Sequence, residues 1–165
     1  VEDAPTTRIY NANIDIEKLA DGDSGNGWNF ADGQLTITDD GAYHIYGTET
    51  ATTNHIKVST GVNAEVLIED VNIDVSGTGS LIYPVSLGES AFEIEAGADV
   101  NLYLKGTNTL TSGLGRSGLE VPGGAAVSIF NEEDANGILK ASATYDGCGI
   151  GGRGGKTITR YEIPD

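Results

Sequence analysis

The segment FEIEAGADVNLYL, residues 92–104, shows the plan on which most of the chain is built. It has an apolar–x–apolar run, a turn at Gly97 and a second alternating run that ends at Leu104. Alternation of this kind, bounded by turn residues, is typical of half-buried β-strands. The segment therefore predicts short strands joined by a tight glycine turn.

Two further segments follow the same plan. They are IKVSTGVNAEVLI, residues 56–68, and LEVPGGAAVSI, residues 119–129, with turns at Gly61 and Gly124. The segments start 36 and 27 residues apart (92 − 56 and 119 − 92), and their turn glycines show the same offsets. Repeats of roughly 20–45 residues are typical of architectures in which each unit buries its apolar face only against its neighbours.

We therefore expect an all-β fold, specifically a right-handed parallel β-helix, a solenoid of about five coils. Residues 28–165 would form this β-helix, and residues 1–27 would form a capping lead-in segment. Ser76–Ser90 is expected to leave it as a loop, and only Ile14–Ala20 could make a turn or two of α-helix. A β-sandwich also has short strands and frequent turns, but it does not predict the paired offsets, so the β-helix is favoured.

The composition excludes several classes of partner. A length of 165 residues is typical of one domain, and 9 basic against 25 acidic residues give a formal net charge of −16. This charge argues against nucleic-acid binding and against attraction to an anionic membrane. No stretch approaches the roughly 18 apolar residues of a transmembrane helix, so no membrane insertion is expected. A single cysteine, no methionine and strong acidity favour a secreted or cell-surface protein.

Several glycine-rich phrases carry a resemblance. They include Leu104-Lys-Gly-Thr-Asn-Thr-Leu-Thr-Ser-Gly113, Gly118-Leu-Glu-Val-Pro-Gly-Gly-Ala125 and Gly147-Cys-Gly-Ile-Gly-Gly152. They resemble the Gly-rich parallel β-helix regions of Gram-positive bacterial surface proteins. The layout is also similar to a family of carbohydrate-binding β-helix proteins that take acidic plant polysaccharides with calcium. The resemblance covers roughly residues 28–155 and implies a polysaccharide ligand that is bound with calcium as cofactor.

Alternation also assigns the outward-facing residues. By the repeat offsets, one outward column, here called the apolar stripe, consists of His44, Leu67, Tyr103 and Phe130. Exposed rows of this kind either bind a ligand or are covered by another segment. The stripe is our candidate polysaccharide-binding surface. The alternative is that the N-terminal segment Arg8–Ala20, or a second copy of the chain, lies across it.

A second outward column contains Lys57, Glu93 and Glu120. Lys57 next to Glu93 is favourable, whereas Glu93 next to Glu120 is unfavourable unless the two charges are screened or bridged by a metal. The other reading of this column is an ordinary solvated charged face.

Two groups of oxygen-bearing side chains are candidate calcium ligands, because calcium takes six to eight oxygens. The groups are Asp21, Asp23 and Asn26 in a glycine-rich turn, and Asp70, Asn72 and Asp74 on one face of a predicted strand. Solvated turn chemistry is the alternative for both. An acidic polysaccharide would need such a bridging cation on a chain of this charge.

Three functions follow from these patterns. The favoured one is a non-catalytic extracellular module that binds carbohydrate. The first alternative is a structural or adhesive module that displays neighbouring domains of a longer chain. The second is a polysaccharide lyase or hydrolase, with Lys105, Arg116 or Arg153 as a base, or with a carboxylate pair, either Asp70 and Asp74 or Glu93 and Glu120. No residue is assigned a catalytic role.

Overall fold

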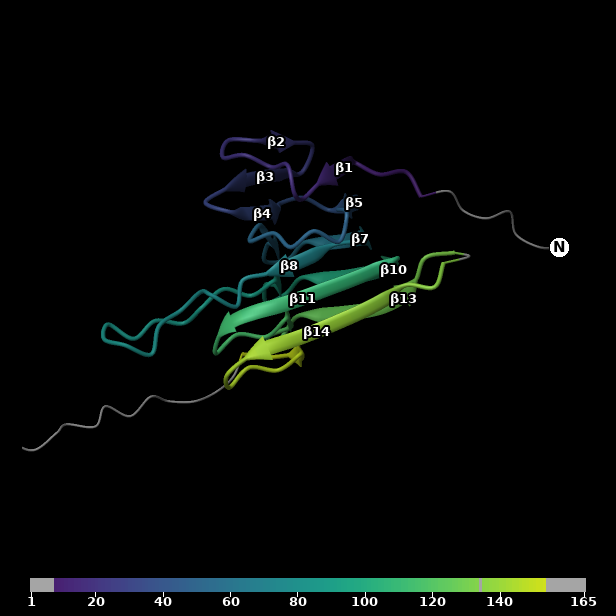
Figure 1. Ribbon diagram of the computed structural model, residues 1–165. Helices are drawn as coiled ribbons and strands as arrows, with labels where there is room; N and C mark the ends of the chain where they lie inside the picture. The colour runs from purple at the N-terminus through teal and green to yellow at the C-terminus, as the bar shows by residue number, and fades with distance from the viewer. Residues whose placement is uncertain (1–7, 134, 154–165) are drawn as a thin grey trace, which may run out of the picture.

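The computed structural model describes residues 8–133 and 135–153, and within these ranges it contains strands and turns but no helix (Figure 1). The all-β prediction is therefore confirmed. The short helix expected over Ile14–Ala20 is wrong, because this segment begins inside a strand and continues as a turn. The strands are β1 (Ala12–Asp15), β2 (Ser24–Gly25), β3 (Trp28–Ala31), β4 (Gln34–Ile37), β5 (Gly41–Tyr46), β6 (His55–Val58), β7 (Asn63–Glu69), β8 (Asn72–Asp74), β9 (Phe92–Ile94), β10 (Asp99–Lys105), β11 (Thr107–Leu114), β12 (Leu119–Glu120), β13 (Ala126–Asn131), β14 (Ile138–Thr144) and β15 (Ile150–Gly151).

The strands form three sheets. A five-stranded sheet has the order β1-β5-β7-β10-β13, a three-stranded sheet has the order β14-β11-β8, and a seven-stranded sheet has the order β15-β12-β9-β6-β4-β3-β2. All pairs in the first two sheets are parallel. The third sheet is mixed, because β2, β3 and β4 pair antiparallel.

The prediction of a single right-handed parallel β-helix of about five coils is therefore wrong. The chain reverses direction at the two-residue loop Asp32-Gly33 between β3 and β4, so these two strands pair antiparallel. Both residues have positive φ, 52° and 77°, as a type I′ hairpin turn requires. The sequence Asp-Gly between two apolar runs is a hairpin signal, and the repeat-based reading passed over it.

The repeat offsets nevertheless reflect real registers. Leu102 pairs with Val66 on one side, 36 residues earlier, and with Ile129 on the other, 27 residues later. Phe92 pairs with Ile56 and Leu119 at the same two offsets. Strands β6, β7 and β8 lie in the seven-, five- and three-stranded sheets in turn, and the next two sets of three strands follow the same rotation.

The core lies between the three sheets, where every second residue of each strand faces inward. Its fully buried members include Leu35, Tyr43, Ile56, Val66, Ile73, Phe92, Leu102, Leu110 and Leu119. The hydroxyl of Tyr43 donates to the carbonyl of Asp39 (2.7 Å), and the carbonyl of Gly27 lies 3.2 Å from the same oxygen, so its polar tip is satisfied. Burial, together with the nearby charges of Asp39 and Asp40, raises the pKa of this hydroxyl.

The loop between β8 and β9 projects from the body of the protein, as predicted for Ser76–Ser90 (Figure 1). A bridge between Ser80 and Ser86 closes it. Its outer part exposes the large apolar side chains of Leu81, Ile82, Tyr83, Val85 and Leu87.

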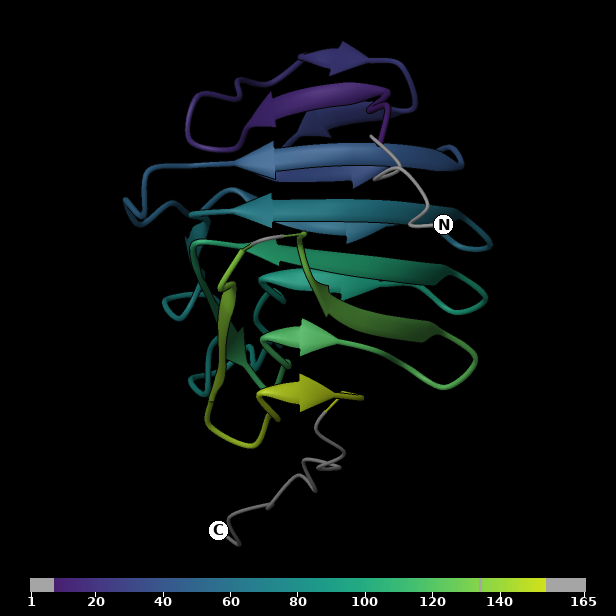
Figure 2. The ribbon, with the colours of Figure 1, turned by 90° about the vertical axis from the view of Figure 1, so that its right-hand side faces the viewer.

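Within each sheet the strands follow one another from one end of the molecule to the other. Figure 2 shows these ends as the purple and yellow extremes of the ribbon. At one end lie β1, β2 and β3; at the other lie β13, β14 and β15, each of which is the edge strand of its sheet. The expected boundary between residues 27 and 28 falls in the turn that joins β2 to β3. Residues 1–7, residue 134 and residues 154–165 lie outside the described part of the chain.

Candidate functional site

The outer face of the seven-stranded sheet carries a pocket of about 590 Å³. Its floor comes from β3, β4 and β6, and one wall comes from the two stems of the loop between β8 and β9. The lining residues are Asn29, Ala31, Asp32, Gly33, Gln34, Thr36, Thr53, His55, Val75, Thr78 and Glu89. We call this the sheet pocket.

Alternation explains why the floor of the sheet pocket is polar. Phe30, Leu35 and Ile56 face the core, so the residues between them face outward. Register then places Asn29 opposite Thr36, and Gln34 opposite His55, on one surface. The amide of Gln34 donates to the hydroxyl of Thr36 (3.0 Å), and a ring nitrogen of His55 lies 3.2 Å from the carbonyl of Thr53.

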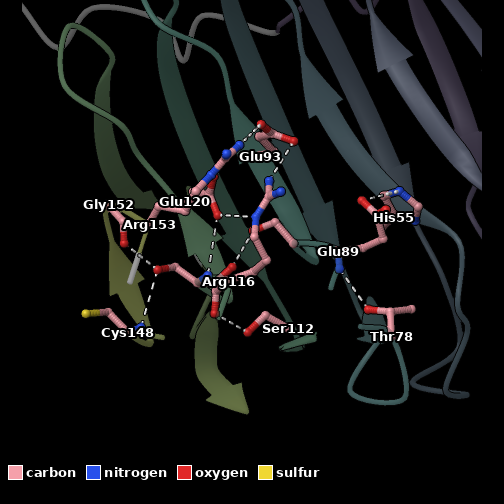
Figure 3. Close-up of polar contacts among 12 residues, drawn as sticks. His55, Thr78, Glu89, Glu93, Ser112, Arg116, Glu120, Cys148, Gly152 and Arg153 are labelled. Atoms are coloured by element: carbon pink, nitrogen blue, oxygen red, sulfur yellow. Dashed lines mark hydrogen bonds and ion pairs between the residues drawn. The ribbon is translucent and has the colours of Figure 1, made fainter. Parts of the chain in front are cut away.

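The wall of the sheet pocket is held by Thr78. Its hydroxyl donates to the carbonyl of Val75 (2.7 Å) and accepts the backbone N–H of Glu89 (2.7 Å), which ties the two stems of the loop together. This fixes Glu89 opposite His55, with 3.9 Å between the carboxylate and Nε2 (Figure 3). The loop stem therefore brings a carboxylate to a pocket floor of amides and hydroxyls.

The lining of the sheet pocket can both donate and accept hydrogen bonds. Asn and Gln amides, Thr hydroxyls, the His ring and two carboxylates all face this space. Sugar hydroxyls, which are donors and acceptors at once, suit such a lining. No Lys or Arg is among the lining residues, so the pocket offers no permanently charged cation to an anionic ligand.

A cluster of two arginines and two glutamates lies further along the same sheet (Figure 3). Arg116 Nε donates to Glu120 (2.7 Å), and Arg116 Nη2 lies 3.1 Å from Glu93. Arg153 Nε donates to the other oxygen of Glu120 (3.2 Å), and its Nη2 lies 3.7 Å from Glu93. We call these four residues the arginine–glutamate cluster.

The arginine–glutamate cluster shows how Glu93 and Glu120 can lie side by side. Register does place Glu93 directly beside Glu120, and arginine side chains bridge the two carboxylates. Lys57 lies beside Glu93 in register, as expected, and its close ion pair is with Glu95 at 2.6 Å. Glu120 is only 1% exposed, so its charge depends on these partners. Burial lowers the pKa of Arg116, but the hydrogen bond to Glu120 and the nearby glutamates outweigh it and raise that pKa, so the guanidinium stays charged.

The apolar stripe exists as a column of neighbours in the five-stranded sheet. Leu67 pairs with His44 on one side and Tyr103 on the other, and Tyr103 pairs with Phe130. The rings of Tyr103 and Phe130 are stacked, with centroids 5.3 Å apart. Leu67, expected to face outward, is buried, whereas Phe130 is 46% exposed.

The N-terminal segment contacts this stripe, as the alternative prediction proposed. The guanidinium of Arg8 lies 3.6 Å from the centroid of the Tyr103 ring, and the ring of Tyr10 lies 5.4 Å from that of His44. Arg8 also pairs with Glu65 (3.2 Å) and Glu132 (2.6 Å). One face of Tyr103 is therefore already occupied.

In the first predicted group of calcium ligands, the two carboxylates accept backbone N–H groups and so stabilise a turn. Asp21 accepts the backbone N–H of Asp32 (2.9 Å), and Asp23 accepts that of Ala20 (2.9 Å). Asn26 is exposed in the turn between β2 and β3.

The second group also binds the backbone. Asp70 accepts the N–H of Thr107 (3.1 Å), and Asn72 donates to the carbonyl of Glu49 (3.0 Å). Asp74 accepts the N–H of Ser76, and hydrogen bonds from Ser76 lower the pKa of its carboxyl. Among residues 8–133 and 135–153, no three His, Cys, Asp or Glu side chains form a group suited to a metal ion. Calcium binding remains a prediction.

Sequence reasoning missed the sheet pocket. Alternation could have found its floor residues Asn29, Gln34 and His55, once the Asp32-Gly33 hairpin had been recognised. The contribution of Thr78 and Glu89 depends on how a loop folds back, for which the sequence carries no periodic signal. Within the described ranges, the structure also has no helix that could cross a lipid bilayer.

Comparison with known proteins does not assign the chain to a family. No protein-family model matches the chain, and neither the curated proteins nor the solved structures contain a match. The resemblance to Gram-positive surface proteins and to carbohydrate-binding families therefore remains a prediction.

Proposed function

We propose that the chain is a non-catalytic carbohydrate-binding module and that the sheet pocket holds its ligand. The observation that carries the proposal is the lining of this pocket: hydroxyl, amide, imidazole and carboxylate groups meet over a sheet floor beside a loop wall. Small-molecule sites are concave and carry convergent polar groups of this kind.

The charges narrow the class of ligand. Asp32 and Glu89 line the sheet pocket, and the chain as a whole has a net charge of −16. An acidic polysaccharide would be repelled unless a cation bridged it. A neutral glycan meets no such penalty, and its hydroxyls can donate to both carboxylates. We therefore propose a neutral glycan as the ligand.

The contacts of one candidate carboxylate pair support a non-catalytic role. Glu93 and Glu120, one of the two pairs considered for a hydrolase, are bridged by Arg116 and Arg153. A hydrolase needs one carboxyl group free to give up a proton and another free to act on water or on the sugar. Arginine-bridged carboxylates suit a structural role better.

The low cysteine content and the acidity, together with a glycan ligand, lead us to propose a secreted or cell-surface location. In that setting the module would act beside neighbouring domains of a longer chain.

Glycan-array screening followed by affinity gels with neutral and acidic polysaccharides tests the ligand. We expect retention by a neutral glycan, unchanged when EDTA is added. Retention by acidic polysaccharides alone, lost in EDTA, would contradict the neutral ligand and favour calcium bridging. No retention by any glycan would overturn the function.

Point variants test the location of the site. Asn29→Ala removes one floor amide and should weaken retention about tenfold, as expected for the loss of one or two hydrogen bonds. Asn101→Ala, on a strand of the five-stranded sheet, is the matched control and should bind like the wild type. Loss of binding in Phe130→Ala but not in Asn29→Ala would place the ligand on the apolar stripe instead.

A further inference from the structure

The backbone decides which nitrogen of the His55 ring carries the hydrogen. His55 is the first residue of β6, and its side chain is only 10% exposed. Nδ1 lies 3.2 Å from the carbonyl oxygen of Thr53. Because a carbonyl can only accept a hydrogen bond, we assign the hydrogen of the neutral ring to Nδ1. Nε2 is then left with a lone pair and acts as an acceptor.

Nε2 of His55 faces a second acceptor in the sheet pocket. A carboxylate oxygen of Glu89 lies 3.9 Å from it, too far for a direct hydrogen bond (Figure 3). The backbone of Glu89 is held by Thr78, whose hydroxyl accepts the Glu89 N–H at 2.7 Å. His55 and Glu89 both line the pocket. Two acceptors that face each other, with no hydrogen between them, leave a place for donors from a ligand.

Two neighbouring hydroxyls of a sugar ring supply donors of the right kind. Each hydroxyl has one hydrogen, so one can donate to Nε2 of His55 and the other to the carboxylate of Glu89. Gauche hydroxyls on adjacent carbons lie about as far apart as two hydrogen-bonded oxygens, and can therefore reach two acceptors in this arrangement. The bond to the carboxylate is charge-assisted and is the stronger of the two. A sugar that lacks one hydroxyl leaves one of the two acceptors unpaired.

Protonation of His55 removes this place. An imidazolium donates from both nitrogens, so its Nε2–H faces the carboxylate of Glu89 as an ion-pair partner. Closing the 3.9 Å gap to a hydrogen bond needs a shift of about 1 Å, and the Glu89 side chain is 49% exposed, which leaves room for it. The pair then uses both acceptors. Since histidine changes its charge between about pH 5 and 8, ligand binding should weaken as the pH falls through this range.

Charges of both signs lie around His55. Asp32, in the turn between β3 and β4, lines the same pocket as Glu89. An imidazolium at this position therefore has carboxylates to pair with. The cations of the same sheet already have partners; they are Lys57, paired with Glu95, and Arg116, bound to Glu93 and Glu120 and also attracted by Glu89.

We propose that neutral His55 and Glu89 together bind two neighbouring hydroxyls of the glycan, and that protonation of His55 releases them. The inference rests on the proposed function, and it narrows the ligand to a neutral glycan with a free vicinal diol. It makes His55 and Glu89 the residues of the sheet pocket that determine specificity.

Nitrogen-15 NMR of the unliganded chain tests the acceptor without any glycan. The chain has two histidines, and His44→Gln leaves the ring signals of His55 alone. At pH 8.0 we expect Nε2 of His55 to show the chemical shift of a ring nitrogen without hydrogen, and Nδ1 that of one with hydrogen. The opposite pattern would make Nε2 a donor and overturn the inference, while the proposed function would stand.

Retention of the wild-type chain by gels of xylan, mixed-linkage β-glucan and galactomannan tests the pH dependence. A glycan that retains the chain at pH 8.0 should bind at least about tenfold more weakly at pH 5.5, with the fold checked by circular dichroism at both values. Equal or stronger retention at pH 5.5 would overturn the inference but not the proposed function. No retention by any glycan at either pH would overturn the proposed function, and the inference with it.

Periodate oxidation of the retaining glycan tests the diol, because periodate cleaves the bond between two carbons that carry free hydroxyls. Retention at pH 8.0 should be lost after oxidation and reduction. Unchanged retention by the oxidised glycan would overturn the recognition of a vicinal diol.

Variants assign the pH dependence to one histidine. His55→Gln replaces the ring by an amide that does not titrate, so retention, weaker than that of the wild type at pH 8.0, should not fall further at pH 5.5. His44→Gln, in the five-stranded sheet, is the matched control and should keep the wild-type dependence. A pH dependence that persists in His55→Gln would belong to another group and overturn the inference. Circular dichroism checks the fold of each variant, and the retention of the wild type at two pH values does not depend on either.

Discussion

The two ends of the molecule close the same alternating strand pattern in different ways. At the β1–β2–β3 end, an antiparallel hairpin and the turn after β1 cover the last core residues, and Ile14, Ile16 and Phe30 are all buried. At the β13–β14–β15 end no described segment does this, and Ile129 and Ile150 are partly exposed. An inward-facing isoleucine is therefore a core residue only where another layer lies beyond it.

An ionic cluster lies near the β13–β14–β15 end, whereas buried apolar residues close the β1–β2–β3 end. The arginine–glutamate cluster joins β9 and β12 to the residues after β15 and lies one strand from the open edge. Buried ion pairs add little stability over apolar packing, but breaking one is costly, because the remaining charge stays buried. The two ends should respond differently to mutation.

Removing the central cation should have the largest effect. Arg116→Met leaves the carboxylate of Glu120, 1% exposed, without its closest partner, and we expect a loss of about 3–5 kcal/mol in the free energy of unfolding. Urea denaturation measures this loss. Arg153→Met is the control: this side chain is 53% exposed, so its loss should cost less than about 1 kcal/mol. Equal losses would mean that Glu120 depends on both arginines alike.

Truncation of one isoleucine at each end tests the comparison directly. Ile14→Ala creates a cavity among buried residues and should cost about 2–5 kcal/mol. Ile129→Ala removes a side chain that is partly in water and should cost about 1 kcal/mol. If the two losses are equal in urea denaturation, the ends do not differ in burial as described.

Arg8 reaches from the segment before β1 toward the opposite end. It stacks on Tyr103 and pairs with Glu65 and with Glu132, which follows β13. Burial lowers the pKa of Arg8, but hydrogen bonds with Tyr10 and Glu132 outweigh it and raise that pKa, so this contact stays charged. Arg8→Ala should cost about 1–2 kcal/mol, the sum of a cation–π contact and partly screened ion pairs.

Arg8→Lys keeps the charge but loses the flat guanidinium that stacks on Tyr103. It should recover only part of the loss in Arg8→Ala, as measured by thermal unfolding and by the near-ultraviolet signal of tyrosine. A wild-type melting temperature in Arg8→Ala would show that the N-terminal segment is not held by this contact.

The sequence predicted which residues pair between strands better than it predicted which side chains would be covered by other segments. Offsets of 36 and 27 residues place Val66, Leu102 and Ile129 side by side, because parallel strands pair residue by residue. The same logic predicted the neighbours of Tyr103 in the apolar stripe. It could not predict that Leu67 would be buried, since alternation assigns a face but not what lies over that face.

The other errors have local causes. The Asp32-Gly33 turn reverses the chain after β3, and a search for equal spacings has no means of detecting a reversal. Glu93 beside Glu120 was correctly placed, but the bridging Arg116 comes from the turn before β12, outside any alternating run. The sheet pocket depends on Glu89, held opposite His55 by Thr78 at the far stem of the loop. Contacts made by loops do not follow the strand period.

The smallest expected effect concerns acid and a contact in the middle of the five-stranded sheet, between the two ends. Glu69 pairs with Lys105 (2.8 Å) and with His44 (2.8 Å), which also contacts Asn13 of β1. Burial raises the pKa of Glu69, but hydrogen bonds from Lys105 and His44 outweigh it and hold that pKa below its ordinary value of 4.5. A lowered folded-state pKa stabilises the protein above the unfolded-state value, and this stability is lost as the pH falls through the folded-state pKa. Glu69→Gln should therefore unfold with a weaker dependence on pH between about 5 and 3 than the wild type, in urea titrations at each pH. Lys105→Met removes one cause of the lowered pKa and should weaken the dependence in the same direction. If it keeps the wild-type slope, the Lys105 contact does not set the acid response of this sheet.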